Sequence, residues 1–197
     1  MAFTGRFDGD ISLFGSAPLT TILKDDIVVG RTGPAMNGLL WAKSFNGADQ
    51  DLGAGVAVDS QGNVILGGYF GMTMNLGNIM LVSPTDSSLF VAKLSPQGDP
   101  LWAHTYGGGF AGLTLPVVLA TTASDAIVVG GCFYGSADFG GGPLSSPGAP
   151  NDIGAIDAFL AELEPSGKYV AARSFGNVSV QAGLGLALAP QGNLLDR

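Results

Sequence analysis

The chain has 197 residues, of which 46% are apolar and 12% charged, the reverse of the balance found in disordered proteins. Its net charge is −8 and its eight basic residues are scattered singly, which excludes the grouped Lys and Arg of a nucleic-acid surface. No apolar run reaches about 18 residues, so no membrane span is expected. The first ten residues lack the pattern of a signal peptide, and the single cysteine excludes an intrachain disulfide.

Taken in chain order, short apolar runs alternate with turn sequences, and no capped segment of helical period is present. The first unit begins with "FTGRF" and closes with the hairpin ending "NGLLWAKSF". The second unit is the clearest, with four runs, "VAVD", "NVILGGYF", "LFVAKL" and "PLWAHTY". The links "DSQGN" and "SPQGD" have turn chemistry, so the four runs predict four antiparallel strands. The third unit contains "VVLATTASDAIVVGG" and "FLAELEPSGKYVAARSF", and "GLALAPQGNLL" at 185–195 echoes the start of the second.

A fixed period links these units. Phe7, Phe70 and Phe133 are spaced by 70 − 7 = 63 and 133 − 70 = 63 residues. Each hairpin closes on an aromatic residue: Phe45, Tyr106 and Phe175. The period exceeds a minimal blade because Gly- and Pro-rich links such as "ADFGGGPLSSPGAP" follow the second run. Four antiparallel strands at a fixed period indicate an all-β fold of β-propeller-type repeats, with three four-stranded blades.

The motifs "VAVDSQGNVILGGYF", "FVAKLSPQGDPLWAHTYGG" and "ADFGGGPLSS" resemble the SBBP-type bacterial β-propeller repeat over essentially the whole chain. The resemblance implies a propeller, commonly in envelope or secreted proteins, without a general set of catalytic residues. The first unit departs from the pattern in its turn, and the third has Ala171 where Trp41 and Trp102 stand. We expect one repeat domain over 1–197 with approximate units 5–67, 68–130 and 131–197.

Three periods are fewer than the ~4–8 blades of a closed propeller. The phase of the ends predicts that the chain starts and stops within equivalent second strands, because Arg197 aligns with Gly67 and Gly5 with Gly68. Two interpretations follow. The chain is a fragment of a longer propeller with a partial or open ring, or two copies associate head-to-tail as a homodimer that completes a six-bladed ring.

Each candidate catalytic residue has counterparts in the other units that indicate its role. His104 occupies the place of Lys43 and Arg173, which predicts a solvent-facing position. The chain offers neither a Cys/His set for zinc nor a Ser-His-Asp set without His104. Cys132 aligns with Arg6 and Tyr69 and has no adjacent His, so a reactive thiolate is not expected.

Two further motifs have a structural interpretation. Gly107, Gly109 and Gly112 match G-x-G-x-x-G, but "LTLPVV" with Pro116 follows where a helix would be needed, so a loop is expected. Asp49 and Asp51 can in principle bind Ca²⁺, but their counterparts carry no acids, which favours solvated loop residues.

Other polar and aromatic residues also have structural interpretations. Asp59 is expected to bond backbone N–H groups of the "DSQGN" turn. Trp41 and Trp102 recur at matching places, which predicts packing between blades. "NVS" at 177–179 is a glycosylation sequon by letters only. Three acids fall just before the expected third strands of the units: Asp25, Asp86 and Asp157. Their recurrence indicates either a structural contact at the blade edge or a ring of acids at the mouth of the propeller channel.

No catalytic, cofactor or metal residue is therefore expected. The hypothesis is a non-enzymatic propeller module that binds an unknown protein or glycan partner or acts as a scaffold. The alternative is an enzyme with a carbohydrate- or quinone-related site at the propeller centre, where acids would converge. A passive structural repeat is the third possibility, which the sequence does not separate from the first.

Overall fold

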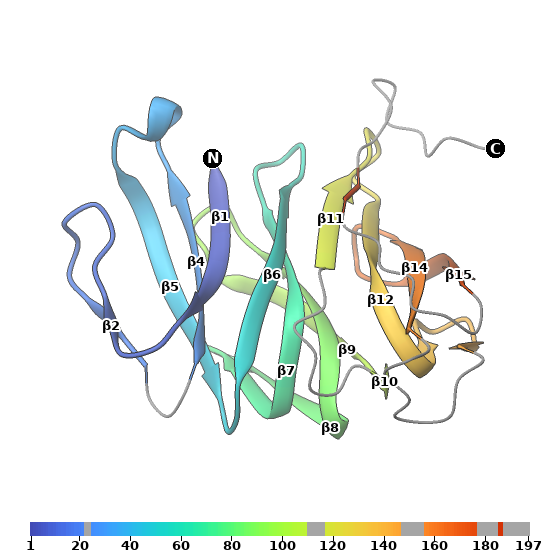
Figure 1. Ribbon diagram of the computed structural model, residues 1–197. Helices are drawn as coiled ribbons and strands as arrows, with labels where there is room; N and C mark the ends of the chain where they lie inside the picture. Colours follow the sequence, from blue (N-terminus) through green and yellow to red (C-terminus); the bar gives the residue numbers. More distant parts are fainter. Residues whose placement is uncertain (22–24, 110–116, 147–155, 177–184, 187–197) are drawn as a thin grey trace.

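The computed structural model describes residues 1–21, 25–109, 117–146, 156–176 and 185–186. In these ranges the chain is nearly all β-strand, with one short 3₁₀ helix at Pro34–Met36. The main strands form three antiparallel blades that stand side by side in an open array and do not close a ring (Figure 1). This confirms the expected all-β fold of β-propeller-type repeats. Within the same ranges, no helix has the length and apolar character needed to cross a membrane.

The repeated hairpins predicted the strands of each blade. The first blade contains β1 (Ala2–Phe7), β4 (Asp26–Thr32) and β5 (Leu39–Gly47). The second contains β6 (Asp51–Val58), β7 (Val64–Leu76), β8 (Ile79–Leu94) and β9 (Pro100–Tyr106). The third contains β11 (Val117–Thr121), β12 (Ile127–Asp138), β14 (Ile156–Leu163) and β15 (Tyr169–Phe175). Neighbouring strands pair antiparallel in chain order, so β1, β4 and β5 correspond to the second, third and fourth strands of the later blades.

Strand β7 shows why a blade needs neighbours on both sides. Successive side chains of a strand point to opposite faces of the sheet. Val64 and Leu66 are buried in a core that includes Ile27 of the first blade. Ile65 is buried in a second core that includes Ile127 of the third blade. Each apolar run is therefore covered only when blades stack, as the repeat predicted.

A small hairpin between the second and third strands accounts for the long period. Strands β7 and β8 continue past the blade and pair as far as Leu76 with Ile79. The equivalent hairpins are β12 with β13 (Pro143–Ser145) and β2 (Asp10–Ile11) with β3 (Leu19–Thr20). Two residues after the repeated Phe, each chain segment has a positive φ: 77° at Gly9, 51° at Met72 and 66° at Gly135.

We expect Met72→Gly to raise the free energy of unfolding by about 0.5–1 kcal/mol, because a left-handed conformation costs an L side chain about 1–2 kcal/mol. Met72 is exposed, so the substitution removes little buried area. Denaturant unfolding measures the effect. The matched control is Gly9→Ala, where an added Cβ meets nothing within 4 Å and φ is +77°. That variant should be destabilised by a similar amount through backbone strain alone, and a gain there would contradict the explanation.

The strand register corrects one alignment of the acids. The residues opposite Phe7, Phe70 and Phe133 are Asp26, Ser88 and Asp157. The prediction that Asp25, Asp86 and Asp157 are equivalent and precede the third strands is therefore wrong. Asp86 lies within β8 and Asp157 within β14, and only Asp25 precedes its strand. The error arises because the link from hairpin to third strand differs in length between blades, so counting along the chain loses the register.

One turn region differs from expectation, and another shows how a turn forms without glycine. Gly108 and Gly109 form the short strand β10 (Gly108–Gly109), which pairs with β12 across a bulge and is not a loop. Gly112 and Pro116 lie outside the described residues. In the third blade, Asp125 with φ of 61° takes the place of Gly62 with φ of 82°, which explains how that turn forms without the Gly-Asn pair.

Candidate functional site at the blade junctions

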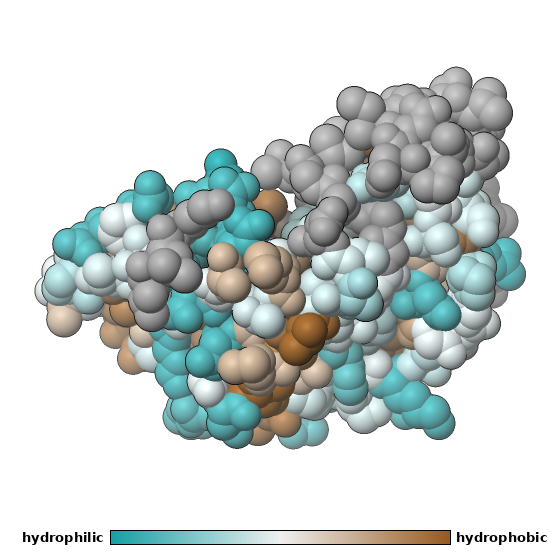
Figure 2. Space-filling model, turned by 90° about the horizontal axis from the view of Figure 1, so that it is seen from below, coloured by the Kyte–Doolittle hydropathy of each residue, from teal (hydrophilic) through white to brown (hydrophobic). Residues whose placement is uncertain are grey.

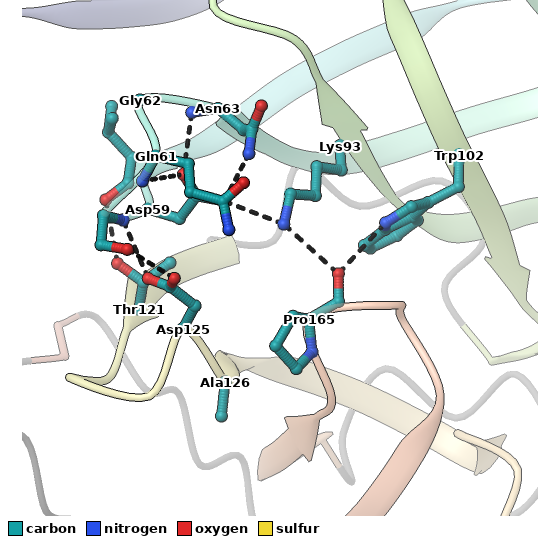
Figure 3. A network of polar contacts seen from close by, with 12 residues as sticks. Asp59, Gln61, Gly62, Asn63, Lys93, Trp102, Thr121, Asp125, Ala126 and Pro165 are labelled. Carbon is teal, nitrogen blue, oxygen red and sulfur yellow. Dashed lines mark hydrogen bonds and ion pairs between the residues drawn. The ribbon is translucent and has the colours of Figure 1, made fainter.

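Each of the two described junctions is fastened by a tryptophan. Trp41 on β5 donates its indole N–H to the backbone oxygen of Pro96, at 2.8 Å, in the turn before β9. Trp102 on β9 donates in the same way to the oxygen of Pro165, at 3.2 Å, in the turn before β15 (Figure 3). The prediction that these residues pack between blades is thus confirmed. We call this contact the tryptophan latch.

The turn that accepts the latch needs glycine. Gly98 has a φ of 86° and Gly167 a φ of 84°. A Cβ on Gly98 would lie 2.9 Å from the ring of Trp41, and one on Gly167 would collide with the ring of His104 and lie 2.9 Å from that of Trp102. The Pro-x-Gly sequence therefore provides both the turn and the space for the indole.

A buried ion pair lies beside the second latch (Figure 3). Lys93 Nζ lies 2.8 Å from Asp59 Oδ2, and both side chains are almost fully buried. The same ammonium group also reaches the backbone oxygen of Pro165 at 3.4 Å. Asp59 Oδ1 accepts the backbone N–H groups of Gln61 and Asn63, as the "DSQGN" turn predicted. Lys93 thus ties a turn of the second blade to the third blade.

The ionisation of Asp59 reflects two opposing effects. Burial disfavours the carboxylate, but hydrogen bonds from Lys93 and Asn63, together with the Lys93 charge, outweigh it and lower the pKa of Asp59. A second carboxylate contact joins the same two blades, since Asp125 accepts the backbone N–H and the hydroxyl of Ser60 at 2.8 and 2.6 Å. The contacts of Lys93 with Pro165 and of Asp125 with Ser60 thus join the second blade to the third.

A buried carboxyl lies at the junction of the first and second blades. Asp51, at the start of β6, has 0% exposure, and neither of its oxygens has a hydrogen-bond partner among the described residues. Its backbone N–H donates to the oxygen of Asp25 at 3.1 Å. The expectation that Asp49 and Asp51 are solvated loop acids is therefore wrong for Asp51, because the first blade covers it. Its counterparts in the other repeats carry no acid, so the internal comparison gave no signal of burial.

Burial raises the pKa of Asp51 to about 8, and the nearby carboxylates of Asp26 and Asp49 act in the same direction. The Gly71 N–H favours the ionised form but does not reach either oxygen with hydrogen-bond geometry. Asp51 is thus mostly protonated at neutral pH. A strongly perturbed acid is a recognised sign of an active site. Here the Asp51 carboxyl is inaccessible to solvent, so its ionisation affects the stability of the junction between the blades.

The remaining candidates do not come together. His104 is exposed, as predicted, and its ring lies 5.1 Å from that of Trp102. Cys132 is buried within the third blade. Asp25 pairs with Arg6 of its own blade at 3.3 Å. Burial raises the pKa of Asp157, and a hydrogen bond from Ser146 of the same blade opposes the shift.

No acid ring forms from the described side chains, since Asp25 and Asp157 each contact their own blades. The side chain of Asp86 and the sequon at 177–179 lie outside the described part. Among the described residues, no group of three or more His, Cys, Asp or Glu side chains is arranged to hold a metal ion.

Two grooves open on the rim, one at each junction. The first rim groove has a volume of about 640 Å³ and is lined by Lys43, Ser44, Phe45, Gly77, Asp99 and Pro100, among others. The second rim groove has a volume of about 540 Å³ and is lined by His104, Thr105, Tyr106, Asp138, Lys168 and Tyr169, among others. Residues 43–45 of β5 in the first groove correspond to residues 104–106 of β9 in the second. Residues 99–100 before and in β9 correspond likewise to residues 168–169 before and in β15, so the grooves are repeats of one another.

The third blade differs from the first two at the aromatic residue that closes its last hairpin. Phe175 is 54% exposed, whereas its equivalents Phe45 and Tyr106 are 4% and 6% exposed against the next blade. Ala171 replaces the latch tryptophan. On the lower side of the molecule, a compact apolar area lies among mainly polar residues (Figure 2). The hairpin of β7 and β8 carries two exposed apolar side chains, Met80 and Val82.

The stacked blades and their repeated junctions define the class of protein, a repeat protein of β-propeller type. No family model matches the chain. It is 25% identical over 146 residues to an uncharacterized WD repeat-containing protein of Acanthamoeba polyphaga mimivirus. The aligned region covers 66% of this chain and 10% of that protein, so the chain corresponds to about a tenth of the relative's length.

Proposed function

We propose that the chain is a non-catalytic β-propeller repeat module that holds partner proteins on a rigid surface, as part of a larger or oligomeric propeller. The observation that supports this proposal is the repeated tryptophan latch. It joins the first blade to the second and the second to the third, and so fixes the positions of the rim grooves and hairpins relative to one another. The relative's WD repeats support the same class of scaffold. The resemblance to SBBP-type repeats supports the finer assignment, with one domain of units 5–67, 68–130 and 131–197.

The proposal is tested by comparing the proteins that wild type and surface variants retain from an extract of the source organism. The variant Met80→Glu with Val82→Glu changes the exposed apolar hairpin, and Asp10→Asn is a control at an exposed acid. A protein held by wild type and by the control, but lost with the hairpin variant, is the expected result. Retention that is equal for all three, at every salt concentration, would count against a specific scaffold surface.

We also propose that the exposed face around Phe175 is covered by a further blade, from a longer parent chain or from a second copy that completes a ring. Burial of the two equivalent aromatics supports this. Light scattering after size exclusion should give about twice 19.9 kDa for the ring-forming homodimer. A monodisperse monomer would exclude the homodimer. A glycan partner and an enzyme with a carbohydrate or quinone site have no supporting contact among the described residues.

A further inference from the structure

The two rim grooves differ at one pair of equivalent positions. In the first groove, Lys43 Nζ on β5 lies 2.7 Å from Asp99 Oδ1, so an ion pair bridges the groove from one blade to the next. In the second groove, His104 stands in the place of Lys43, and Lys168 in the place of Asp99. The second groove therefore has His104 and Lys168 at the two positions where the first groove has the ion pair of Lys43 with Asp99.

Among the described residues, neither Lys168 nor His104 forms an ion pair with a carboxylate. Lys168 is exposed and makes no ion pair in the described part of the chain. In the described chain, the one hydrogen-bond partner of the His104 ring is the backbone oxygen of Ser166, at 3.4 Å, and the ring lies beside those of Trp102 and Tyr106. Asp138 also lines this groove, but its Oδ1 accepts the N–H groups of Gly140 and Gly142 at 2.7 and 3.2 Å, which directs that oxygen to its own turn.

We propose that the second rim groove binds an acidic peptide segment of a partner protein, whose Asp or Glu carboxylate takes the place that Asp99 fills in the first groove. Lys168 would hold the carboxylate through a charge-assisted hydrogen bond, and a ring N–H of His104 would donate a second hydrogen bond. Tyr169, which is partly exposed, provides aromatic contact for a flanking residue. The inference deepens the proposed scaffold function and rests on it.

An extended peptide suits this place better than a compact ligand. In the described chain, β9 pairs along its length with β8 alone, so its other edge offers backbone N–H and C=O groups. Residues 104–106 of this strand also line the groove. The volume of about 540 Å³ is within the range of ligand pockets and accommodates one or two side chains rather than a folded surface.

The single histidine of the chain reports on the groove directly, because its imidazole C–H signals in proton NMR need no assignment. The probe is an acetylated, amidated tetraglutamate peptide, with the tetraglutamine peptide as the matched control. We expect a saturable shift of the His104 signals with tetraglutamate and none with tetraglutamine. No saturable shift up to millimolar peptide, or an equal response to both peptides, would overturn the proposal.

Two variants separate a specific site from general attraction of an acidic peptide. Lys168→Asp places an acid in the second groove at the position equivalent to Asp99 of the first groove. It should weaken tetraglutamate binding at least tenfold. Arg173→Asp makes the same change in charge at an exposed position of the third blade outside the groove, and should leave binding within twofold. Equal loss in both variants would overturn the site. This experiment uses purified protein and a synthetic peptide. A negative result would therefore overturn the peptide site without deciding the partner-retention experiment, which tests the scaffold function separately.

Discussion

Replacing Asp51 by Asn is expected to raise the free energy of unfolding at pH 8 by at least about 2 kcal/mol. The pKa of this carboxyl is about 8 in the folded protein, against an ordinary value near 4 in the unfolded chain. Folding therefore requires proton uptake at any pH between these values. The wild type is most stable with respect to this group below pH ~4, loses stability as the pH rises, and loses no more above about pH 8. The amide side chain of the variant has no proton to gain or lose.

Denaturant unfolding at pH 5, 6.5, 8 and 9 measures this component. The difference between variant and wild type should grow with pH over this range and level off near its upper end. Asp10→Asn is the matched control, since Asp10 is exposed and the variant has the same net charge. If Asp51→Asn were no more stable than wild type at pH 8, or if the control showed the same gain, burial beside Asp26 would not be the cause.

The second large effect is expected at the ion pair of Asp59 and Lys93. Asp59→Asn should lower the free energy of unfolding by about 3 kcal/mol, because it leaves the Lys93 charge buried without its carboxylate. Lys93→Met should cost less, since Asp59 keeps the N–H groups of Gln61 and Asn63. The double variant should be more stable than the sum of the single losses predicts, since it removes both charges.

The pH dependence of Asp59 has the opposite sign to that of Asp51. A lowered pKa contributes stability that is present above the unfolded value of about 3.9 and is lost as the pH falls through the folded pKa. Unfolding followed at pH 2.5, 4 and 7 should show wild type converging on Asp59→Asn in acid. A difference between the two that stays constant from pH 7 to pH 2.5 would contradict the ion-pair explanation.

The sequence predicted the blades because their signals are local. The Pro-x-Gly turns, the recurrent Phe and the paired Trp41 and Trp102 each depend on a few neighbouring residues, and the structure places them as predicted. Asp51 was misassigned because its burial depends on stacking against Asp25 and Asp26 of the first blade, and not on its immediate neighbours in the sequence. Its counterparts carry no acid, so the comparison between repeats had nothing to detect.

The rim grooves could not be predicted from the sequence. The equivalence of Lys43 and His104 was evident from the repeat, but each alone indicated a solvent-facing residue. Their meaning depends on Asp99 and Lys168, which lie in the next repeat and approach only when blades stack. The one-residue slip between Asp25 and Asp26 has a similar origin, because register is set by pairing with β1 and not by distance along the chain.

The tryptophan latch has a direction. In both junctions the indole belongs to the earlier blade and the carbonyl to the later one. A ribosome delivers the indole first, so each blade emerges with its fastening incomplete and is secured only when its successor has been made. The third blade has Ala171 in place of the tryptophan, so it has no indole N–H that needs a carbonyl from a later blade. Shortening the chain from its C-terminus by one blade would therefore expose an unused indole donor and an uncovered aromatic, whereas removal of the first blade would leave the second latch intact.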